Sequence, residues 1–110
     1  MEWINLRTED QLDELITKSA TRPQIIFKHS IRCSISALAK NRLDKEKSPD
    51  EMDFYYLDLI NNRDLSDKVA EVFGVSHESP QVLVIKNGES VYDESHMGIT
   101  MKAITAQASF

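Results

Sequence analysis

The chain has 110 residues, 41% of them hydrophobic and 28% charged, and its formal net charge is −5. A chain of this length forms one domain, residues 1–110, and buries roughly two-thirds of its unfolded surface. The acidic balance argues against nucleic acids and anionic membranes as partners. No apolar run approaches the roughly 18 residues of a membrane span, and the start of the chain lacks a signal-peptide pattern. We therefore expect a cytoplasmic protein, whose oligomeric state the sequence leaves undefined.

The first half of the chain alternates β-prone runs with helical patterns. A capping-box pattern at 8–11 and apolar residues at helical spacing predict the first helix. Compact β-prone runs predict the strands, and Pro49 ends a second helix. The expected elements are an edge strand over 3–6, a helix over 8–20, a strand over 24–28 and a helix from about Cys33 to Ser48-Pro49.

The second half predicts a third strand and helix and then a hairpin. Gly74 is typical of a helix C-cap, and Asn87-Gly88 indicates a tight hairpin because both turn positions accept positive φ. The expected elements are a strand over 52–58, a helix over 62–74, strands over 81–86 and 90–93, and a last helix that starts at Thr100 and contains Met101, Ile104 and Phe110.

This order of elements defines the fold class. Alternation of strands and helices in the first half implies parallel strands joined by right-handed crossovers. The closing hairpin implies antiparallel strands at one side of the same sheet. The sequence therefore predicts an α/β fold, a mixed central β-sheet with helices on both faces.

Two segments carry a resemblance to known proteins. The segment "ESPQVLVIKNGESVYDESHMGITMKAI" is similar to the proline-containing strand, hairpin and final helix of thioredoxin, and the resemblance to thioredoxin covers nearly the whole chain. The segment "IIFKHSIRCSISALA" resembles the YtxJ family, thioredoxin-fold proteins proposed as monothiol bacilliredoxins, whose usual motif is Thr-Cys-Pro-Ile-Ser. The expected fold is therefore thioredoxin-like.

The sequence departs from both patterns near its single cysteine, Cys33. Arg32 and Ser34 replace the threonine and the proline of the family motif. Ser36 stands where thioredoxin has its second active-site cysteine, and Phe27 stands where thioredoxin has a buried aspartate. These departures exclude dithiol chemistry within this chain and leave monothiol chemistry open.

Cys33 is the candidate nucleophile. Taken alone, an isolated cysteine is most often a small buried hydrophobe. A cysteine in the first turn of a helix, however, faces unpaired backbone N–H groups and the positive end of the helix dipole, and both favour the thiolate. Lys28 and Arg32 add positive charge, and Ser36 is placed to donate its hydroxyl to the sulfur. Each has a simpler alternative: Ser36 as a polar helix residue, and Arg32 as a solvated loop charge.

The resemblance implies how a thiol substrate would be held. It implies a cis peptide bond before Pro80, which leaves the backbone of Ser79 free to pair with an extended substrate. Bacillithiol, a cysteine amide of glucosamine linked to malate, brings two carboxylates to the site. We expect Lys28 and Arg32 to bind these carboxylates, with Ser79 and the turn at Gly98 lining the rest of the groove. Lys28 could instead point away, because alternate strand residues face opposite sides.

The function implied by the resemblance is thiol–disulfide exchange that removes bacillithiol from S-bacillithiolated cytoplasmic proteins through Cys33. Bacillithiol is then a co-substrate, bacillithiolated proteins are the partners, and no bound cofactor is required. The three histidines, His29, His77 and His96, show no metal-ligand spacing, so no metal site is expected. Two alternatives remain: an iron–sulfur carrier like the monothiol glutaredoxins with a Cys-Gly-Phe-Ser motif, and a non-enzymatic stress or binding protein that kept the fold.

Overall fold

In the computed structural model, which describes residues 1–109, the elements follow one another in the predicted order. One 3-10 turn, η1, is added before the last helix, and the expected contribution of Phe110 lies outside the described residues. The elements are β1 (Ile4–Asn5), α1 (Glu9–Lys18), β2 (Gln24–His29), α2 (Ser34–Asp44), β3 (Asp53–Asp58), α3 (Arg63–Phe73), β4 (Gln81–Lys86), β5 (Glu89–Ser95), η1 (His96–Gly98) and α4 (Met101–Ala108).

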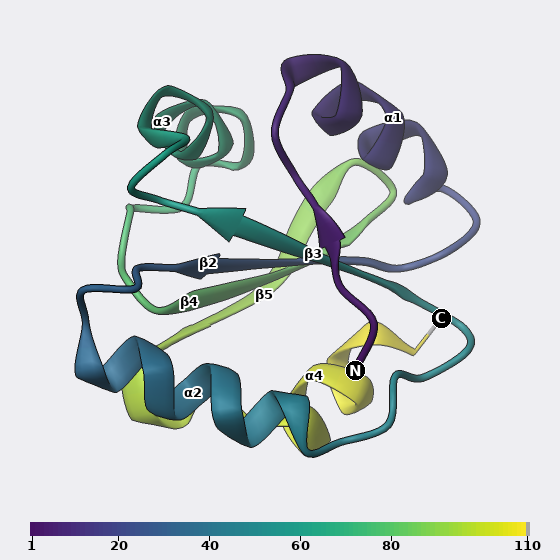
Figure 1. Cartoon of the computed structure of the whole chain (residues 1–110). Coiled ribbons are helices and arrows are strands. Elements are labelled where there is room, and N and C mark those ends of the chain that lie inside the picture. Colours follow the sequence, from purple (N-terminus) through teal and green to yellow (C-terminus); the bar gives the residue numbers. More distant parts are fainter. Residues whose placement is uncertain (110) are drawn as a thin grey trace.

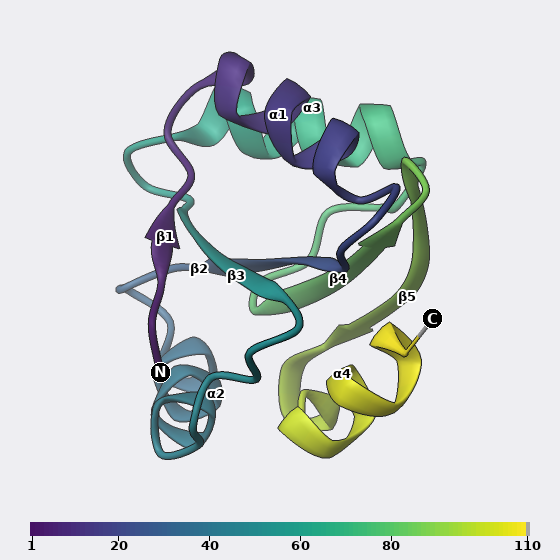
Figure 2. The same cartoon turned by 90° about the vertical axis from the view of Figure 1, so that its right-hand side faces the viewer.

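The five strands of the described chain form one mixed sheet in the order β1-β3-β2-β4-β5. Strands β1, β3 and β2 run parallel, whereas β4 is antiparallel to both β2 and β5. Helices α1 and α3 cover one face of the sheet, and α2 and α4 cover the other (Figures 1 and 2). The predicted α/β class, with helices on both faces and the hairpin at one side, is confirmed.

Local sequence signals explain several element ends. The side chain of Thr8 accepts a hydrogen bond from the backbone of Gln11, and the Gln11 side chain accepts one from the backbone of Thr8, which completes the predicted capping box. Gly74 ends α3 in the left-handed conformation with φ 65°. Asn87 and Gly88 both have positive φ in the turn between β4 and β5, as the hairpin signal predicts.

Alternation along β2 divides the core into two layers. Ile25 and Phe27 belong to the cluster packed with α2 and α4, and Ile26 belongs to the cluster packed with α1 and α3. Fully burying one large apolar side chain contributes about 1.5 to 3 kcal/mol. Lys28 follows Ile26 at a spacing of two and is also fully buried, so one cation lies on the side of the sheet that faces α3.

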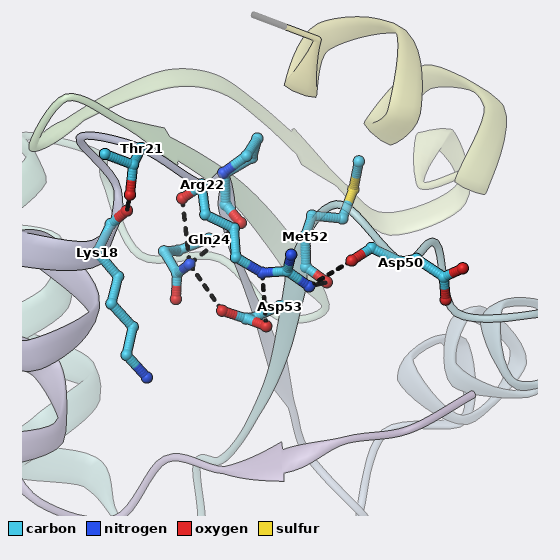
Figure 3. Close-up of polar contacts among 8 residues, drawn as sticks. Lys18, Thr21, Arg22, Gln24, Asp50, Met52 and Asp53 are labelled. Carbon is cyan, nitrogen blue, oxygen red and sulfur yellow. Dashed lines mark hydrogen bonds and ion pairs between the residues drawn. The ribbon is translucent and has the colours of Figure 1, made fainter.

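A polar cluster joins the amino ends of β2 and β3 (Figure 3). Arg22 Nε lies 3.0 Å from a carboxylate oxygen of Asp53, and Arg22 also donates to the carbonyls of Asp50 and Met52. The Gln24 amide donates to the other carboxylate oxygen of Asp53 at 2.9 Å. Because β2 separates this cluster from Cys33, we assign it to strand registration and not to the thiol site. Among residues 1–109, no helix has the length and hydropathy to cross a membrane.

Candidate functional site

The candidate site lies where β2 and β3 end and β4 begins. The backbone N–H of Leu59, just after β3, donates to the carbonyl of His29 at the end of β2. Gln81, the first residue of β4, pairs with Lys28 across the antiparallel ladder. The loops after β2 and β3 therefore meet the loop before β4 at the carboxyl edge of the parallel strands, which is where open α/β sheets place their ligand sites.

Cys33 is the N-cap residue of α2. Its backbone is extended, with φ −108° and ψ 118°, and its carbonyl accepts the first helical hydrogen bond from Ala37. The N–H of Cys33 donates to the carbonyl of Ser30 at 3.1 Å, which closes the loop between β2 and α2. The thiol is free and half-buried. It stands beside first-turn N–H groups that have no partner within the helix, at the positive end of the helix dipole.

A surface groove of about 460 Å³ contains this thiol. It combines the Cys33 thiol with two guanidinium groups and an imidazole. Its lining residues are Ser30, Arg32, Cys33, Leu59, Ile60, Arg63, His77 and Ser79. Hollows of similar or larger volume lie elsewhere on the surface, but the chain has no thiol outside this groove. Within residues 1–109, no group of three or more His, Cys, Asp or Glu side chains is arranged to hold a metal ion.

Ser36 is fully buried, and its hydroxyl has partners other than the sulfur. Its oxygen lies 2.7 Å from Nδ1 of His29 and accepts a hydrogen bond from the N–H of Ser30 at 3.1 Å. Burial lowers the pKa of His29, and the nearby Lys40 ammonium adds to this effect. A neutral imidazole that accepts at Nδ1 fits this arrangement. Ser36 therefore joins the end of β2 to the first turn of α2.

Lys28 does not line the groove. Its ammonium lies 3.4 Å from the carbonyl oxygen of Ser66 and 3.4 Å from Nδ1 of His77. Burial lowers the pKa of Lys28 to about 8, against an opposing attraction from Asp67. The alternation of side chains along β2 explains this placement, because Lys28 faces α3 and not the thiol. Of the two cations expected to meet a ligand, the structure places Arg32 in the groove and Lys28 beneath it.

The remaining expected site residues lie around the same edge of the sheet. Ser79 lines the groove, and the Ser79–Pro80 peptide bond is cis. Pro80 is buried at the start of β4, and its carbonyl accepts a hydrogen bond from the N–H of His96. Gly98 is exposed at the end of η1 and is not among the lining residues; a Cβ there would lie 2.6 Å from the carboxyl carbon of Glu94.

Two groove residues, Arg63 and His77, were missed by sequence reasoning. Arg63 is the first residue of α3 and follows β3 by a short loop, so its position at the carboxyl edge of the sheet was inferable from the predicted topology. His77 stands three residues before Pro80 in the loop that leads into β4. Its proximity to Cys33 depends on pairing between β2 and β4, which no local pattern predicts.

Phe27 stands where thioredoxin has a buried aspartate, and its surroundings are aromatic. Phe27 is fully buried and stacks on Trp3 and His29, with ring centroids 5.5 and 5.8 Å apart. Lys40 lies over the rings of Trp3 and Tyr56. At this position of the fold, an aromatic stack thus replaces the buried carboxylate of thioredoxin. The fold and the site together define a thioredoxin-fold protein with a single thiol at the start of its second helix.

Comparison with known proteins identifies the family. The sequence profile of the monothiol bacilliredoxin BrxC family matches residues 4–104. Because this match covers most of the chain, the chain belongs to that family, and the resemblance to YtxJ-type monothiol bacilliredoxins is confirmed.

Solved structures support the same fold. A protein described as a candidate oxidoreductase with a thioredoxin fold is 35% identical, with a TM-score of 0.84 over 96% of this chain and 93% of that chain. Thioredoxin of Malassezia sympodialis is 17% identical, with a TM-score of 0.78 over 98% and 92% of the two chains. Thioredoxin of Fasciola hepatica is 22% identical, with a TM-score of 0.75 over 94% and 97%. The last two likenesses show the fold alone. The thioredoxin-like fold is confirmed, and family and fold support a thiol redox function.

Proposed function

We propose that this chain is a monothiol oxidoreductase that removes bacillithiol from S-bacillithiolated cytoplasmic proteins through Cys33. One observation carries the proposal: in a member of the monothiol bacilliredoxin family, the only cysteine is a half-buried N-cap in an open groove. A purely structural cysteine would be sealed in the core, away from ligands. The helix start, Arg32 and Arg63 together make the groove suited to an anionic thiol.

The reaction is thiol–disulfide exchange in two steps. The thiolate of Cys33 attacks the bacillithiol sulfur of a mixed disulfide, the bond to the substrate cysteine breaks, and that cysteine leaves as a thiolate that takes up a proton. Cys33 is now linked to bacillithiol. The chain has no second cysteine to resolve this bond, so a second bacillithiol thiolate attacks the bacillithiol sulfur, frees Cys33 and forms bacillithiol disulfide.

Intact-mass measurement tests the proposal. The protein is incubated with a peptide whose cysteine is bacillithiolated, and both species are weighed over time. We expect the peptide to lose bacillithiol while the protein gains one equivalent, and free bacillithiol to reverse the gain. Cys33→Ser should fold normally and gain nothing. Ser34→Ala, one residue further along the same turn, is a matched control that should react as the wild-type chain does.

Two results would count against the proposal. A Cys33 thiol that reacts with small alkylating reagents but never accepts bacillithiol would leave a protein with an accessible thiol and another function. A chain that develops visible absorbance after incubation with iron and sulfide, and that loses it in Cys33→Ser, would favour the iron–sulfur carrier.

A further inference from the structure

Two titratable side chains in contact with each other lie at the thiol groove and take no part in the two exchange steps of the proposed function. The pair is Lys28, which is fully buried on β2, and His77, which lines the groove. Lys28 Nζ lies 3.4 Å from Nδ1 of His77, and the Ser66 hydroxyl lies 3.3 Å from the same nitrogen. The Ser66 carbonyl accepts a second hydrogen bond from Lys28 at 3.4 Å. Lys28 is thus held in place by a backbone group of α3.

This arrangement fixes the protonation of the His77 ring. A lysine ammonium donates hydrogen bonds and accepts none, so Nδ1 must be the acceptor and Nε2 carries the proton. Burial lowers the pKa of His77, as do the charges of Lys28 and Arg63, which keeps the ring neutral near pH 7. The other charged groups around the pair are Asp67 on α3 and Glu78 next to His77; both oppose this lowering.

His77 is also placed to meet the substrate. It shares the groove with Cys33 and with Ser79, the residue before the cis peptide bond. The mixed disulfide must enter this groove to reach the Cys33 sulfur. The Lys28 ammonium occupies Nδ1 and leaves His77 with one free N–H, at Nε2. His77 is therefore suited to donate a proton to a sulfur that becomes negative in the groove.

We propose that His77 protonates the thiolate that leaves when Cys33 attacks a disulfide, and that Lys28 replaces this proton at Nδ1. The inference rests on the proposed exchange reaction and assigns it a general acid. His77 is the catalytic residue in this scheme, and Lys28 is a positioning residue and proton reservoir.

The proton balance of the step is complete. The Cys33 thiolate forms a bond to the attacked sulfur, and the departing sulfur keeps the electron pair of the broken bond. That sulfur takes the proton from Nε2 of His77 while Nδ1 takes one from the Lys28 ammonium. Lys28 is left as a neutral amine, His77 is left as the other neutral tautomer, and one proton from solvent resets the pair.

The pKa of Lys28 is suited to this proton transfer. Burial lowers the pKa of Lys28 to about 8, close to the value of about 8.5 for an ordinary alkyl thiol. Proton transfer between groups of similar pKa has little energetic cost in either direction, so the same pair can serve exchange in both directions.

Reaction rates with two uncharged disulfides distinguish a general acid from a residue that only positions Cys33. Attack on bis(2-hydroxyethyl) disulfide expels an alkyl thiolate, which gains from a proton donor. Attack on 4,4′-dithiodipyridine expels a thiopyridone that needs no proton on sulfur. We compare the rates of both reactions in the wild-type chain, in His77→Gln and in Lys28→Met. His96→Asn is the control, because His96 is an exposed histidine outside the groove lining and asparagine tolerates its positive φ of 57°.

We expect His77→Gln and Lys28→Met each to lose about 100-fold in rate with the alkyl disulfide, the lower end of general acid catalysis. With the aromatic disulfide they should lose less than about twofold, and His96→Asn should match the wild-type chain. The wild-type rate per thiolate with the alkyl disulfide should fall as the pH rises through about 8, because Lys28 then loses its proton. This fall should be absent from Lys28→Met.

Equal slowing with both disulfides would overturn the proposal, because it would mean that the pair positions Cys33 or supports the fold. Unchanged rates with both disulfides would overturn it as well. Neither outcome would affect the proposed function, which fails only if the wild-type Cys33 does not exchange with bacillithiolated substrates.

Discussion

The hydroxyl oxygen of Ser36 lies 2.7 Å from Nδ1 of the buried His29. Because the same oxygen accepts the N–H of Ser30 at 3.1 Å, its own hydrogen is free to be donated to the imidazole. One serine therefore satisfies two polar groups at the end of β2. The position that holds a second cysteine in thioredoxin serves here to fix the loop that carries Cys33.

Replacing this hydroxyl should weaken the fold. Ser36→Ala leaves the N–H of Ser30 and the acceptor nitrogen of His29 without a protein partner, and such losses cost about 1 to 3 kcal/mol. We expect the free energy of unfolding in urea to fall by that amount. Ser34→Ala, on the exposed side of the same turn, is the matched control and should stay within about 0.5 kcal/mol of the wild-type chain.

The same variants test whether the Ser36 hydroxyl donates a hydrogen bond to the Cys33 sulfur. We expect iodoacetamide to alkylate native Cys33 at similar rates in Ser36→Ala and in Ser34→Ala. Slower alkylation of Ser36→Ala, with an unchanged free energy of unfolding, would place the hydroxyl on the thiolate, as the sequence suggests.

Lys28→Met should stabilise the protein at neutral pH. Burial lowers the pKa of Lys28 from 10.5 to about 8. Between these two pH values, the unfolded chain therefore holds a proton that the folded chain has lost. By linkage, this group makes the free energy of unfolding rise with pH from about 8 to 10.5, and its full penalty is present below about pH 8. Methionine fills a similar volume without a charge and removes this penalty, so we expect a gain of at most about 3 kcal/mol.

Urea unfolding of both chains at pH 7 and at pH 9.5 measures this effect. The advantage of Lys28→Met should be larger at pH 7 and should shrink at pH 9.5. Taking the difference between the chains removes the contributions of other groups, such as Tyr55, whose pKa burial raises to about 12. A variant that is less stable at pH 7 would show that the contacts of the ammonium with Ser66 and His77 outweigh its desolvation.

Local signals in the sequence were sufficient for the fold. The capping box at Thr8, the C-cap at Gly74 and the turn at Asn87-Gly88 act over a few residues, and the structure has each where the pattern predicts it. The order of strands then follows from alternation and from the short hairpin. The first helix ends at Lys18, two residues before the expected boundary, and the second ends at Asp44, four residues before Ser48.

The site was only partly predictable because pairing between strands brings its residues together. Cys33 and Arg32 are adjacent in the sequence, so the sequence alone predicts that they lie in one site. His77 reaches the groove from the loop before β4, and no local pattern predicts this position. Arg63 reaches it from the start of α3, a position that only the predicted order of elements indicates. Lys28 is near Cys33 in sequence, but the two-residue period of β2 turns it toward Ser66.

Recognition of bacillithiol should depend on the two groove arginines. The malate group brings two carboxylates toward a chain of net charge −5, so local cations must offset the overall repulsion. Arg32 and Arg63 both line the groove. Arg63 lies 3.5 Å from a carboxylate oxygen of Asp67, but both side chains are more than half exposed, so this ion pair contributes little. Its guanidinium can therefore turn to a ligand carboxylate.

Arg32→Ala/Arg63→Ala should slow exchange with bacillithiol disulfide about 5- to 100-fold, because two charge-assisted contacts at an exposed site contribute about 1 to 3 kcal/mol together. The loss should shrink at high salt, which screens the attraction. Exchange with bis(2-hydroxyethyl) disulfide, which carries no charge, should change less than about twofold. Lys102→Ala removes one positive charge from α4 and controls for the overall field. If the double variant slows both disulfides equally, the arginines act on the Cys33 thiolate and do not recognise the ligand.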